Sequence, residues 1–309
     1  MNPDTTKRGS VPRSSLTALA GRTLGAIPPP ALVVLGIVSV QVGAALAKHL
    51  VNAVGSFGAV ALRLFFAAAV LLLLWRPSLR MNRRAWTVVL TYGVILGVMN
   101  LCFYVALARL PLGIVVTIEF LGPLAVALAG SRRWLDAFWA VLAAGGVVLL
   151  MEGRGHLDLV GGLFALAAGV CWGLYILVGA ALGRHTTEGN GLALGMVVAA
   201  VVAVPFGLTG GGRALIQPWV LVAGLGVALL SSVIPYSVEL EALRKIPPSV
   251  FGILMSLEPA VAALIGLLLL QESLHWSQWI AVLCVVAASA GATRGARPDV
   301  QTPASPAVS

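Results

Sequence analysis

Residues 246–266 read IPPSVFGILMSLEPAVAALIG, an apolar run long enough to cross a membrane that nevertheless carries Glu258 followed directly by Pro259. An ionisable side chain near the bilayer centre costs about 2.5–3.5 kcal/mol on insertion scales, so it needs a functional or structural partner. Because a helix rises about 1.5 Å per residue, Glu258 is expected near mid-depth. Pro259 has no amide hydrogen, so the carbonyl of Met255 loses its helical donor and the helix is weakened here.

A second stretch with the same plan, residues 110–130, reads LPLGIVVTIEFLGPLAVALAG and carries Glu119 and Pro123. When residues 106–130 are shifted by 136 positions, eight of the 25 are repeated. Chance would give about three matches in a chain this rich in Ala and Leu, so we interpret the chain as two copies of one unit. The glutamates do not coincide in this register, because Glu119 falls on Met255. Each copy therefore carries a carboxylate, and the two are about one helical turn apart in the repeat.

The composition is that of an integral membrane protein. Hydrophobic residues make up 59% of the 309 residues, charged residues 10%, and the mean hydropathy is +0.99. Soluble domains carry about 25% charged residues, so this chain cannot cover a water-facing surface. The net charge of +9 does not indicate nucleic-acid binding, since the basic residues lie in short loops, as membrane topology requires. Cys102, Cys171 and Cys284 lie in apolar runs without metal-binding spacing, so neither a disulfide nor a metal site is expected.

Ten apolar segments follow a polar tail at residues 1–30, and each is close to the roughly 20 residues that a spanning helix needs. They are residues 31–50, 56–75, 85–108, 112–130, 134–151, 159–182, 190–208, 218–240, 248–270 and 275–292. A second polar tail covers residues 293–309. We therefore predict an all-α integral membrane protein with ten transmembrane helices and no cleaved signal peptide. In the sixth segment, Ala165, Gly169 and Gly173 repeat every four residues, a spacing that predicts close helix packing.

Lys and Arg are distributed unevenly between the two sides of this arrangement. If the N-terminus is inside, fifteen basic residues fall on the inner side: Lys7, Arg8, Arg13, Arg22, Arg76, Arg80, Arg83, Arg84, Arg132, Arg133, Arg184, Arg244, Lys245, Arg294 and Arg297. Four fall on the outer side: Lys48, Arg109, Arg154 and Arg213. The excess predicts that both termini are cytoplasmic. Since five spans per copy is an odd number, the second copy (residues 159–292) is predicted to be inverted relative to the first (residues 31–151), an arrangement typical of secondary transporters.

Two further charged residues are predicted within or near the membrane. Arg63 lies about a third of the way into the second segment, where it can hold a carboxylate by two parallel hydrogen bonds or form a structural ion pair with Glu119 or Glu258. Lys48 lies near the outer end of the first segment, where it can bind substrate or extend its ammonium group to the interface. The two glutamates have the same alternatives, a functional role or a private basic partner.

Polar and aromatic residues on the same helices are predicted to complete a cavity, although packing and interface roles are the alternative for the aromatic ones. They are Gln41, Asn100, Tyr104, Trp172, Tyr175, Ser231, Ser232 and Tyr236. The sequence contains no Walker A, HExxH or GxSxG motif, so neither ATP hydrolysis nor proteolysis is expected. We therefore expect no enzyme activity and no cofactor.

Several stretches taken together carry a family resemblance. They are QVGAALAK (41–48), ALRL (61–64), YGVILGVMNLCFYVAL (92–107), PLGIVVTIEFLGPLAVAL (111–128), SRRWLDAFW (131–139), ALAAGVCWGLYI (165–176), PYSVELEAL (235–243) and FGILMSLEPAVAAL (251–264). The chain resembles, over residues 39–289, the drug/metabolite transporter superfamily with two EamA repeats, and within it the threonine/homoserine exporters. The resemblance implies an inner-membrane carrier, able to act as a monomer, that exports small amino acids using the proton gradient. One difference is Gln271-Glu272-Ser273, where Gly-Glu-Thr is usual.

We therefore predict an inner-membrane exporter of small amino acids that works by proton antiport, with substrate, protons and the lipid bilayer as its partners. Glu258 is the expected proton-exchanging group, and Pro123 and Pro259 are the expected hinges. The expected substrate-binding residues are Glu119, Arg63, Lys48, Gln41, Asn100, Tyr104, Trp172, Tyr175 and Tyr236. The alternatives are an exporter of other metabolites or toxic amphiphiles, which favours a weakly charged aromatic cavity, and a membrane scaffold or sensor that transports nothing. The sequence does not determine the oligomeric state.

Overall fold

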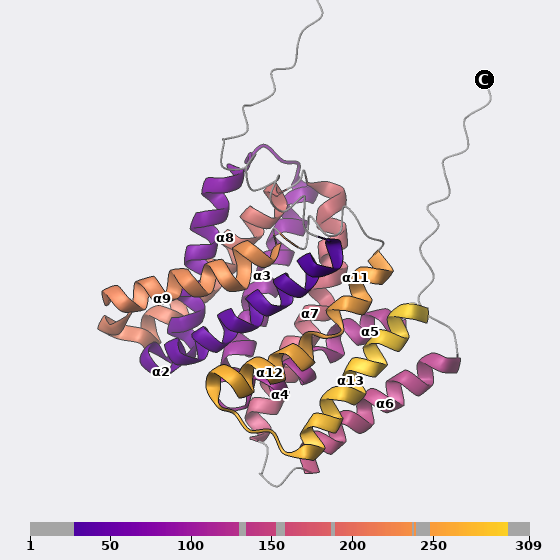
Figure 1. The fold of residues 1–309 in the computed structure, drawn as a ribbon. Coiled ribbons are helices and arrows are strands. Elements are labelled where there is room, and N and C mark those ends of the chain that lie inside the picture. Colours follow the sequence, from indigo (N-terminus) through magenta and orange to yellow (C-terminus); the bar gives the residue numbers. More distant parts are fainter. Residues whose placement is uncertain are drawn as a thin grey trace, which may run out of the picture.

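The computed structural model describes residues 28–129, 134–152, 158–186, 189–236, 238 and 248–295, and every regular element within them is helical (Figure 1). The first half contains α2 (Pro29–Trp75), α3 (Arg83–Leu107), α4 (Leu112–Glu119), α5 (Leu121–Ala129) and α6 (Trp134–Glu152). The second half contains α7 (Leu159–His185), α8 (Asn190–Gly211), the 3₁₀ turn η1 (Gly212–Ile216), α9 (Pro218–Ala228), the π-helical segment η2 (Leu229–Val233), α11 (Pro248–Met255), α12 (Glu258–Leu270) and α13 (Trp276–Gly295). The all-α prediction is confirmed, while the predicted polar tails fall largely outside the described residues.

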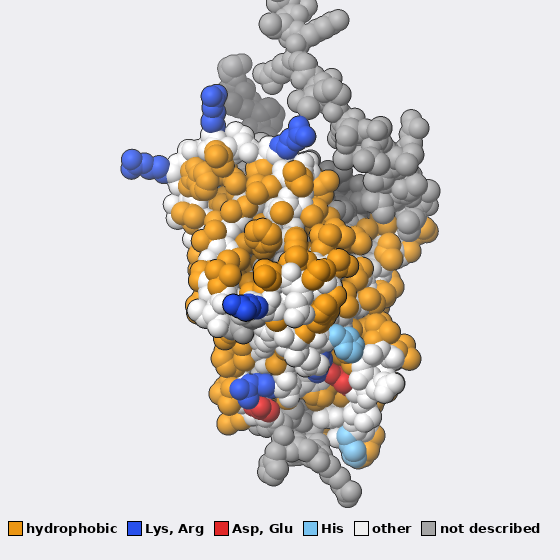
Figure 2. Space-filling view, turned by 90° about the vertical axis from the view of Figure 1, so that its left-hand side faces the viewer, with side chains coloured by type: hydrophobic (Ala, Val, Ile, Leu, Met, Phe, Trp, Pro, Cys, Tyr) orange, Lys and Arg blue, Asp and Glu red, His pale blue; other side chains and the backbone are white. Residues whose placement is uncertain are grey.

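The outer surface of the helices is apolar enough to face lipid. Seven of the described helices have the length and composition to cross a membrane, and shorter apolar helices occupy Leu112–Val126 and Ala137–Val147. Side chains such as Trp134 and Leu73 are 80% and 75% exposed, which water would penalise and lipid does not. Figure 2 shows a broad hydrophobic surface, with Lys and Arg at one end and side chains of both charges with His towards the other. The chain is therefore a multi-pass membrane protein.

Helix α2 covers the first two predicted spans. Its 47 residues would extend about 70 Å if straight, more than twice the roughly 30 Å hydrocarbon core of a bilayer. At Gly55 the backbone has φ 73° and ψ 167°, a conformation that glycine alone adopts readily, and α2 kinks there. The kink lies between residues 31–50 and 56–75, the two segments that hydropathy separated.

Two predicted spans are interrupted at corresponding places. Helices α4 and α5 meet at Phe120, and α11 and α12 meet at Ser256 and Leu257. A shift of 136 residues places α4 on α11 with the same length of eight residues, so the two interruptions fall at corresponding positions under this shift. Pro123 and Pro259 follow the breaks and remove one helical hydrogen bond each, which explains why the sequence breaks there.

Helices from the two halves of the sequence lie side by side through the centre of the molecule (Figure 1). Helix α2 packs against α8 and α9, α3 against α7 and α8, α4 against α12, and α6 against α13. The largest buried cluster combines both halves, with Leu50, Tyr104, Leu182, Met196 and Val227 among its members. The core therefore lies between the halves, so neither half has a separate core of this size.

The contact between α5 and α7 depends on glycine. A methyl group at Gly169 would lie 2.8 Å from the carbonyl oxygen of Glu119, and one at Gly122 would overlap the carbonyl oxygen of Gly169. Gly173 meets the carbonyl of Gly122 in the same way, at 3.3 Å. The prediction of close packing from the small-residue spacing in α7 is therefore confirmed.

Replacing Gly122 by Ala is expected to weaken this contact, because overpacking costs about 1–3 kcal/mol. Gly162→Ala is the matched control, since nothing lies within 4 Å of a methyl group there and Ala forms helix better than Gly. The measurement is the thermal unfolding midpoint of each purified variant in detergent. Equal midpoints for the two variants would show that α5 and α7 do not approach so closely.

Candidate functional site

A cavity of about 510 Å³ opens among α2, α3, α4, α5, α7, α11, α12 and α13, beside η2. Its size falls in the range of about 300–1,000 Å³ that is usual for small-ligand pockets. The predicted site residues that line it are Gln41, Arg63, Asn100, Glu119, Pro123, Trp172, Tyr175, Ser231, Tyr236 and Glu258. Residues more than 200 positions apart in the sequence are thus brought to one site, as the inverted-repeat interpretation expects.

Arg63 lines the cavity and is held by a backbone carbonyl and an aromatic ring. Its Nη2 donates a hydrogen bond to the carbonyl oxygen of Ser231 at 3.1 Å, and its guanidinium carbon lies 5.8 Å from the centre of the Tyr104 ring. Its Nε is buried and has no hydrogen-bond partner among the described residues. Arg63 therefore has one fixed contact and one unused donor next to the cavity.

Glu119 ends α4 and is only 7% exposed. Arg63 acts on it electrostatically, yet the two form no direct ion pair in the part of the chain that the structure describes. The private Arg63–Glu119 pair that we considered as an alternative is therefore not formed. A cation and an anion instead line the same cavity without cancelling each other by contact.

The π-helical segment η2 supplies the partner of Arg63. Within it, the amide of Ile234 donates to the carbonyl of Leu229, and Pro235 has no amide hydrogen to offer the carbonyl of Ser231. Arg63 uses the Ser231 carbonyl, and the hydroxyl of Ser39 donates to the carbonyl of Leu230 at 2.8 Å. The sequence analysis missed this anchor, although Pro235 four residues after Ser231 is the same signal as Pro123 four residues after Glu119.

Glu258 begins α12 and is 6% exposed. Its Oε1 accepts a hydrogen bond from Nε2 of Gln41 on α2 at 3.1 Å. The Oε1 of Gln41 is buried and has no hydrogen-bond partner among the described residues. Pro259 is buried directly behind Glu258 but does not line the cavity. The predicted proton-exchanging carboxyl group is thus in the cavity, at the interrupted part of its span.

Aromatic residues form much of the remaining wall. Trp172 packs edge-on against Phe120, with ring centres 5.4 Å apart, and Tyr175 stacks on Tyr92 at 4.8 Å. Asn100 and Tyr236, which coincide under the 136-residue shift, both line the cavity.

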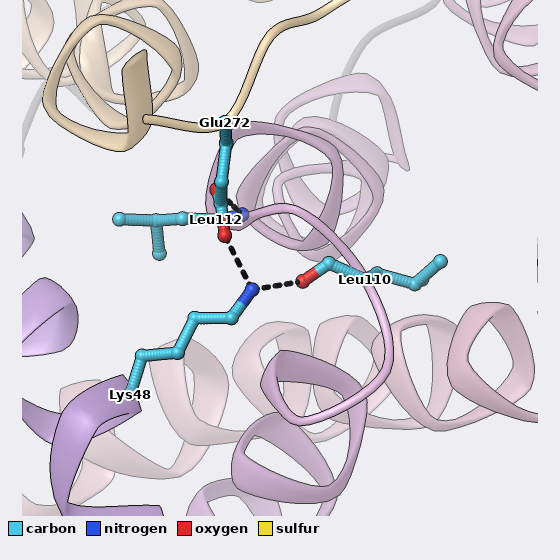
Figure 3. Close-up of polar contacts among 4 residues, drawn as sticks. All are labelled: Lys48, Leu110, Leu112 and Glu272. Atoms are coloured by element: carbon cyan, nitrogen blue, oxygen red, sulfur yellow. Dashed lines mark hydrogen bonds and ion pairs between the residues drawn. The ribbon is translucent and has the colours of Figure 1, made fainter. Parts of the chain in front are cut away.

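The structure does not place Tyr104, Ser232 or Lys48 in the cavity, and Ser232 is instead buried beside it in η2. Tyr104 is fully buried, behind Arg63 and within the main core cluster, so it supports the guanidinium from outside the cavity. Lys48 pairs with Glu272 and donates to the carbonyl oxygen of Leu110 at 2.8 Å (Figure 3). Among the described residues no group of three or more His, Cys, Asp or Glu side chains is arranged to hold a metal ion.

A multi-pass helical protein whose polar cavity lies at the meeting of interrupted helices has the architecture of a secondary membrane transporter. Residues 159–294 match the EamA-like transporter family. The threonine/homoserine exporters RhtA of Salmonella typhimurium and Escherichia coli are each 42% identical to this chain over 277 and 275 residues, covering 88% of it and 94% and 93% of their own lengths. The chain therefore belongs to the EamA-like transporter family, in the group of the RhtA exporters, as the resemblance predicted.

Two more distant similarities agree with this assignment. An uncharacterized transporter of Bacillus subtilis, YwfM, is 26% identical over 240 residues, covering 74% of this chain and 80% of its own. A solved crystal structure that is 21% identical superposes with a TM-score of 0.58 over 86% of this chain and 97% of its own, which shows a shared fold. The relatives are transporters, which confirms the prediction that this protein is not an enzyme.

Proposed function

We propose that this protein exports small amino acids such as threonine and homoserine from the cell across the inner membrane, in exchange for protons. The observation that carries the proposal is a cavity that holds Arg63, Glu119 and Glu258 inside a wall that is largely apolar and aromatic. A zwitterion leaving water needs one cationic and one anionic partner, because an unpaired charge in an apolar cavity is strongly disfavoured. The names of the exporters in its group support this class of cargo.

Arg63 is the proposed partner of the substrate carboxylate. The Ser231 carbonyl fixes one of its nitrogen atoms, so less side-chain entropy is lost when the carboxylate binds. Its buried Nε supplies a donor that a carboxylate oxygen would satisfy. Glu119 lines the same cavity and is the proposed partner of the ammonium end of the substrate.

Two buried oxygen atoms of the cavity suit the hydroxyl group of such a substrate. Ser231 Oγ and Gln41 Oε1 have no hydrogen-bond partner among the described residues, and both residues line the cavity. A buried acceptor without a partner disfavours a cargo that leaves it so, and a hydroxyl group would satisfy it. Hydroxyl-bearing amino acids therefore fit better than purely aliphatic ones.

We infer that the membrane domain has ten spans, arranged as two inverted repeats at residues 31–151 and 159–292. The parts of α2 before and after the kink at Gly55 count as two spans, whereas α4 with α5 and α11 with α12 count as one span each. The packing supports a two-fold relation, because α6 packs on α13 and residues 56–75 of α2 pack on α8, and a 136-residue shift places the first member of each pair on the second. The excess of Lys and Arg in the inner loops supports cytoplasmic termini on both ends of the chain.

Glu258 is the proposed proton carrier of the cycle. It is buried, hydrogen-bonded through Gln41 to the first half of the chain, and located where α11 gives way to α12. An arriving ammonium group favours the ionised carboxylate and expels its proton, whereas departure of the cargo allows protonation again. Pro123 and Pro259 are the proposed hinges, since each lies beside an interrupted helix whose hydrogen-bond ladder is already incomplete.

The aromatic wall favours a second candidate, export of amphiphilic metabolites. Trp172, Phe120, Tyr175 and Tyr236 give the cavity several apolar ring faces. A neutral amphiphile would leave the three charged residues unused, so the zwitterion accounts for more of the cavity.

The test is efflux from cells that overproduce the protein. Cells loaded with labelled threonine are expected to lose it faster than cells with the empty vector, and an uncoupler is expected to abolish the difference. Valine, which lacks the hydroxyl group, should leave more slowly. Efflux of hydrophobic dyes without efflux of threonine would instead identify the amphiphile exporter.

Glu258→Gln keeps the shape and hydrogen bonding of the side chain but removes its titration. This variant is expected to reach the membrane and to lose gradient-driven export, while Glu119→Gln changes the apparent affinity for the amino acid more than the coupling. Export is measured at several external pH values, with protein levels checked, and Asp158→Asn, which changes an exposed carboxylate, serves as control. Normal pH-dependent export by Glu258→Gln would place the coupling on another group, with Glu119 the first to examine.

Arg63→Lys keeps the charge but loses the planar fork that binds two carboxylate oxygens. We expect the apparent affinity for threonine to fall about tenfold, corresponding to the loss of roughly 1.4 kcal/mol. Arg213→Lys, on the exposed turn η1, is the matched control. An unchanged affinity in Arg63→Lys would contradict bidentate recognition of the carboxylate and would leave Arg63 the role of a point charge or a packing residue.

A further inference from the structure

Lys48 and Glu272 form a polar clasp together with the backbone of Leu110 and Leu112 (Figure 3). The ammonium group of Lys48 pairs with Oε1 of Glu272 and also donates to the Leu110 carbonyl at 2.8 Å. The other carboxylate oxygen, Oε2, accepts a hydrogen bond from the amide of Leu112 at 2.7 Å. The side chains are only 22% and 14% exposed, so the clasp is largely shielded from water. Both carboxylate oxygens of Glu272 and two of the three ammonium donors of Lys48 are used at once.

The clasp joins three separate segments from both halves of the chain. Lys48 belongs to α2, Leu110 and Leu112 to the turn that enters α4, and Glu272 to the turn that leaves α12. Through Leu112 the carboxylate of Glu272 caps the beginning of α4, and the opposite end of α4 carries Glu119. A contact at this end of the molecule therefore positions the helix that bears a cavity glutamate.

The backbone around Glu272 is shaped for this contact. Gln271 has φ 55°, an unusual conformation for a residue other than glycine, and the amide of Glu272 returns to the carbonyl of Gly266 at 3.1 Å. A methyl group at Gly266 would lie 2.9 Å from Oε2 of Glu272. Glycine at that position therefore leaves the space in which the carboxylate lies.

An apolar layer separates the clasp from the cavity. It is a buried cluster of small and branched side chains: Ala44, Ala45, Leu107, Leu112, Val116 and Ala262. Ala44 and Val116 of this cluster line the cavity, whereas Leu112 bonds to Glu272 in the clasp. On this side the cavity is therefore closed by a dry layer followed by an ion pair, as in a two-layer gate.

We propose that Lys48 and Glu272 are the positioning residues that hold this gate shut on the outer side of the membrane, and that cargo is released when they separate. The inference rests on the proposed export function and membrane orientation. The clasp is suited to this role because its two charges, once separated, must be solvated by water. Water that enters from the outer side when the gate opens provides this solvation. The clasp closes the cavity without occupying it, so cargo can bind while the gate is shut.

The neighbouring ion pair, Arg109 with Asp158, is a matched control. It lies in the same turn region but is 44% and 35% exposed, so water and salt screen it. Asp158 mainly caps α7: its hydrogen bonds from the amide of Gly161 and from Arg109 hold the pKa of its carboxyl below the usual range. Removing this pair is not expected to open the cavity.

The test uses a reporter cysteine in the cavity. Ser289→Cys is introduced into a chain whose Cys102, Cys171 and Cys284 are replaced by Ala, since Ser289 lines the cavity and is 5% exposed. A membrane-impermeant methanethiosulfonate reagent is applied to intact cells and, separately, to inverted vesicles. Labelling of the cysteine from each side is compared between the reporter chain and gate variants built on it.

Lys48→Met and Glu272→Gln are each expected to raise labelling from outside about fivefold or more, the size of a modest conformational coupling. The double variant should equal the stronger single variant, because the second substitution removes a partner that is already lost. Lys48→Arg and Arg109→Gln should label like the reporter chain. An unchanged rate in both single variants, or effects that multiply in the double variant, would overturn the gate.

The two-sided assay separates this inference from the proposed function. A rise confined to inverted vesicles would overturn the outer assignment, because the clasp would then close the cytoplasmic side. If the labelling responds as expected but the protein exports no amino acid, the gate is supported and the proposed cargo is wrong. Threonine efflux is therefore measured on the same variants.

Discussion

Buried charge in a bilayer is the constraint on which the site depends. A charged side chain there is stable only where the protein replaces the water that it has lost. Arg63 is solvated in part by the Ser231 carbonyl, and Glu258 by the amide of Gln41. In each case the partner comes from a helix distant in sequence, so the charge can be tolerated only after the two halves have packed. The fold and the site are therefore formed together.

Backbone groups supply much of this solvation because proline removes their usual donors. Pro235 follows Ser231 by four residues, and the carbonyl that it leaves without a donor holds Arg63. Pro123 leaves the carbonyl of Glu119 in the same position, where it meets the bare backbone of Gly169. Incomplete helices thus lie around the cavity, where side chains or close-packed glycine compensate for the missing hydrogen bonds. The same incomplete hydrogen bonding makes these places suited to bending.

The arrangement separates the charged residues at the cavity from an ion pair beyond it. Arg63, Glu119 and Glu258 border the cavity, while Lys48 and Glu272 satisfy one another beyond an apolar layer. The proposed transport cycle uses both sets, because the cargo must be recognised and the cavity must not be open to both sides of the membrane at once. The apolar layer between the two sets leaves the Lys48–Glu272 pair outside the cavity.

The sequence by itself determined the class of protein, the apolar segments and the interrupted helices. Hydropathy and proline act locally, so the apolar segments and the breaks beside Pro123 and Pro259 can be recognised without knowing any contact. Most of the cavity residues could also be predicted, because a polar or charged residue in an apolar span has few places to lie other than the interior. The sequence did not determine which of these residues contact one another. Contacts between residues on different helices depend on how the two halves pack.

Only the tertiary structure decided the partners. Lys48 and Glu272 are 224 positions apart, and nothing in either local sequence distinguishes an ion pair from a substrate-binding lysine and a separate loop glutamate. The Ser39 and Arg63 contacts to η2 likewise depend on α2 lying against that segment. The sequence did not decide whether Arg63 pairs directly with Glu119, because both residues are expected at membrane depth. A shift of a few ångströms between two helices decides between a direct ion pair and two charges that only share a cavity. Local chemistry fixes where charge is placed along the chain, and packing between distant helices fixes what each charge touches.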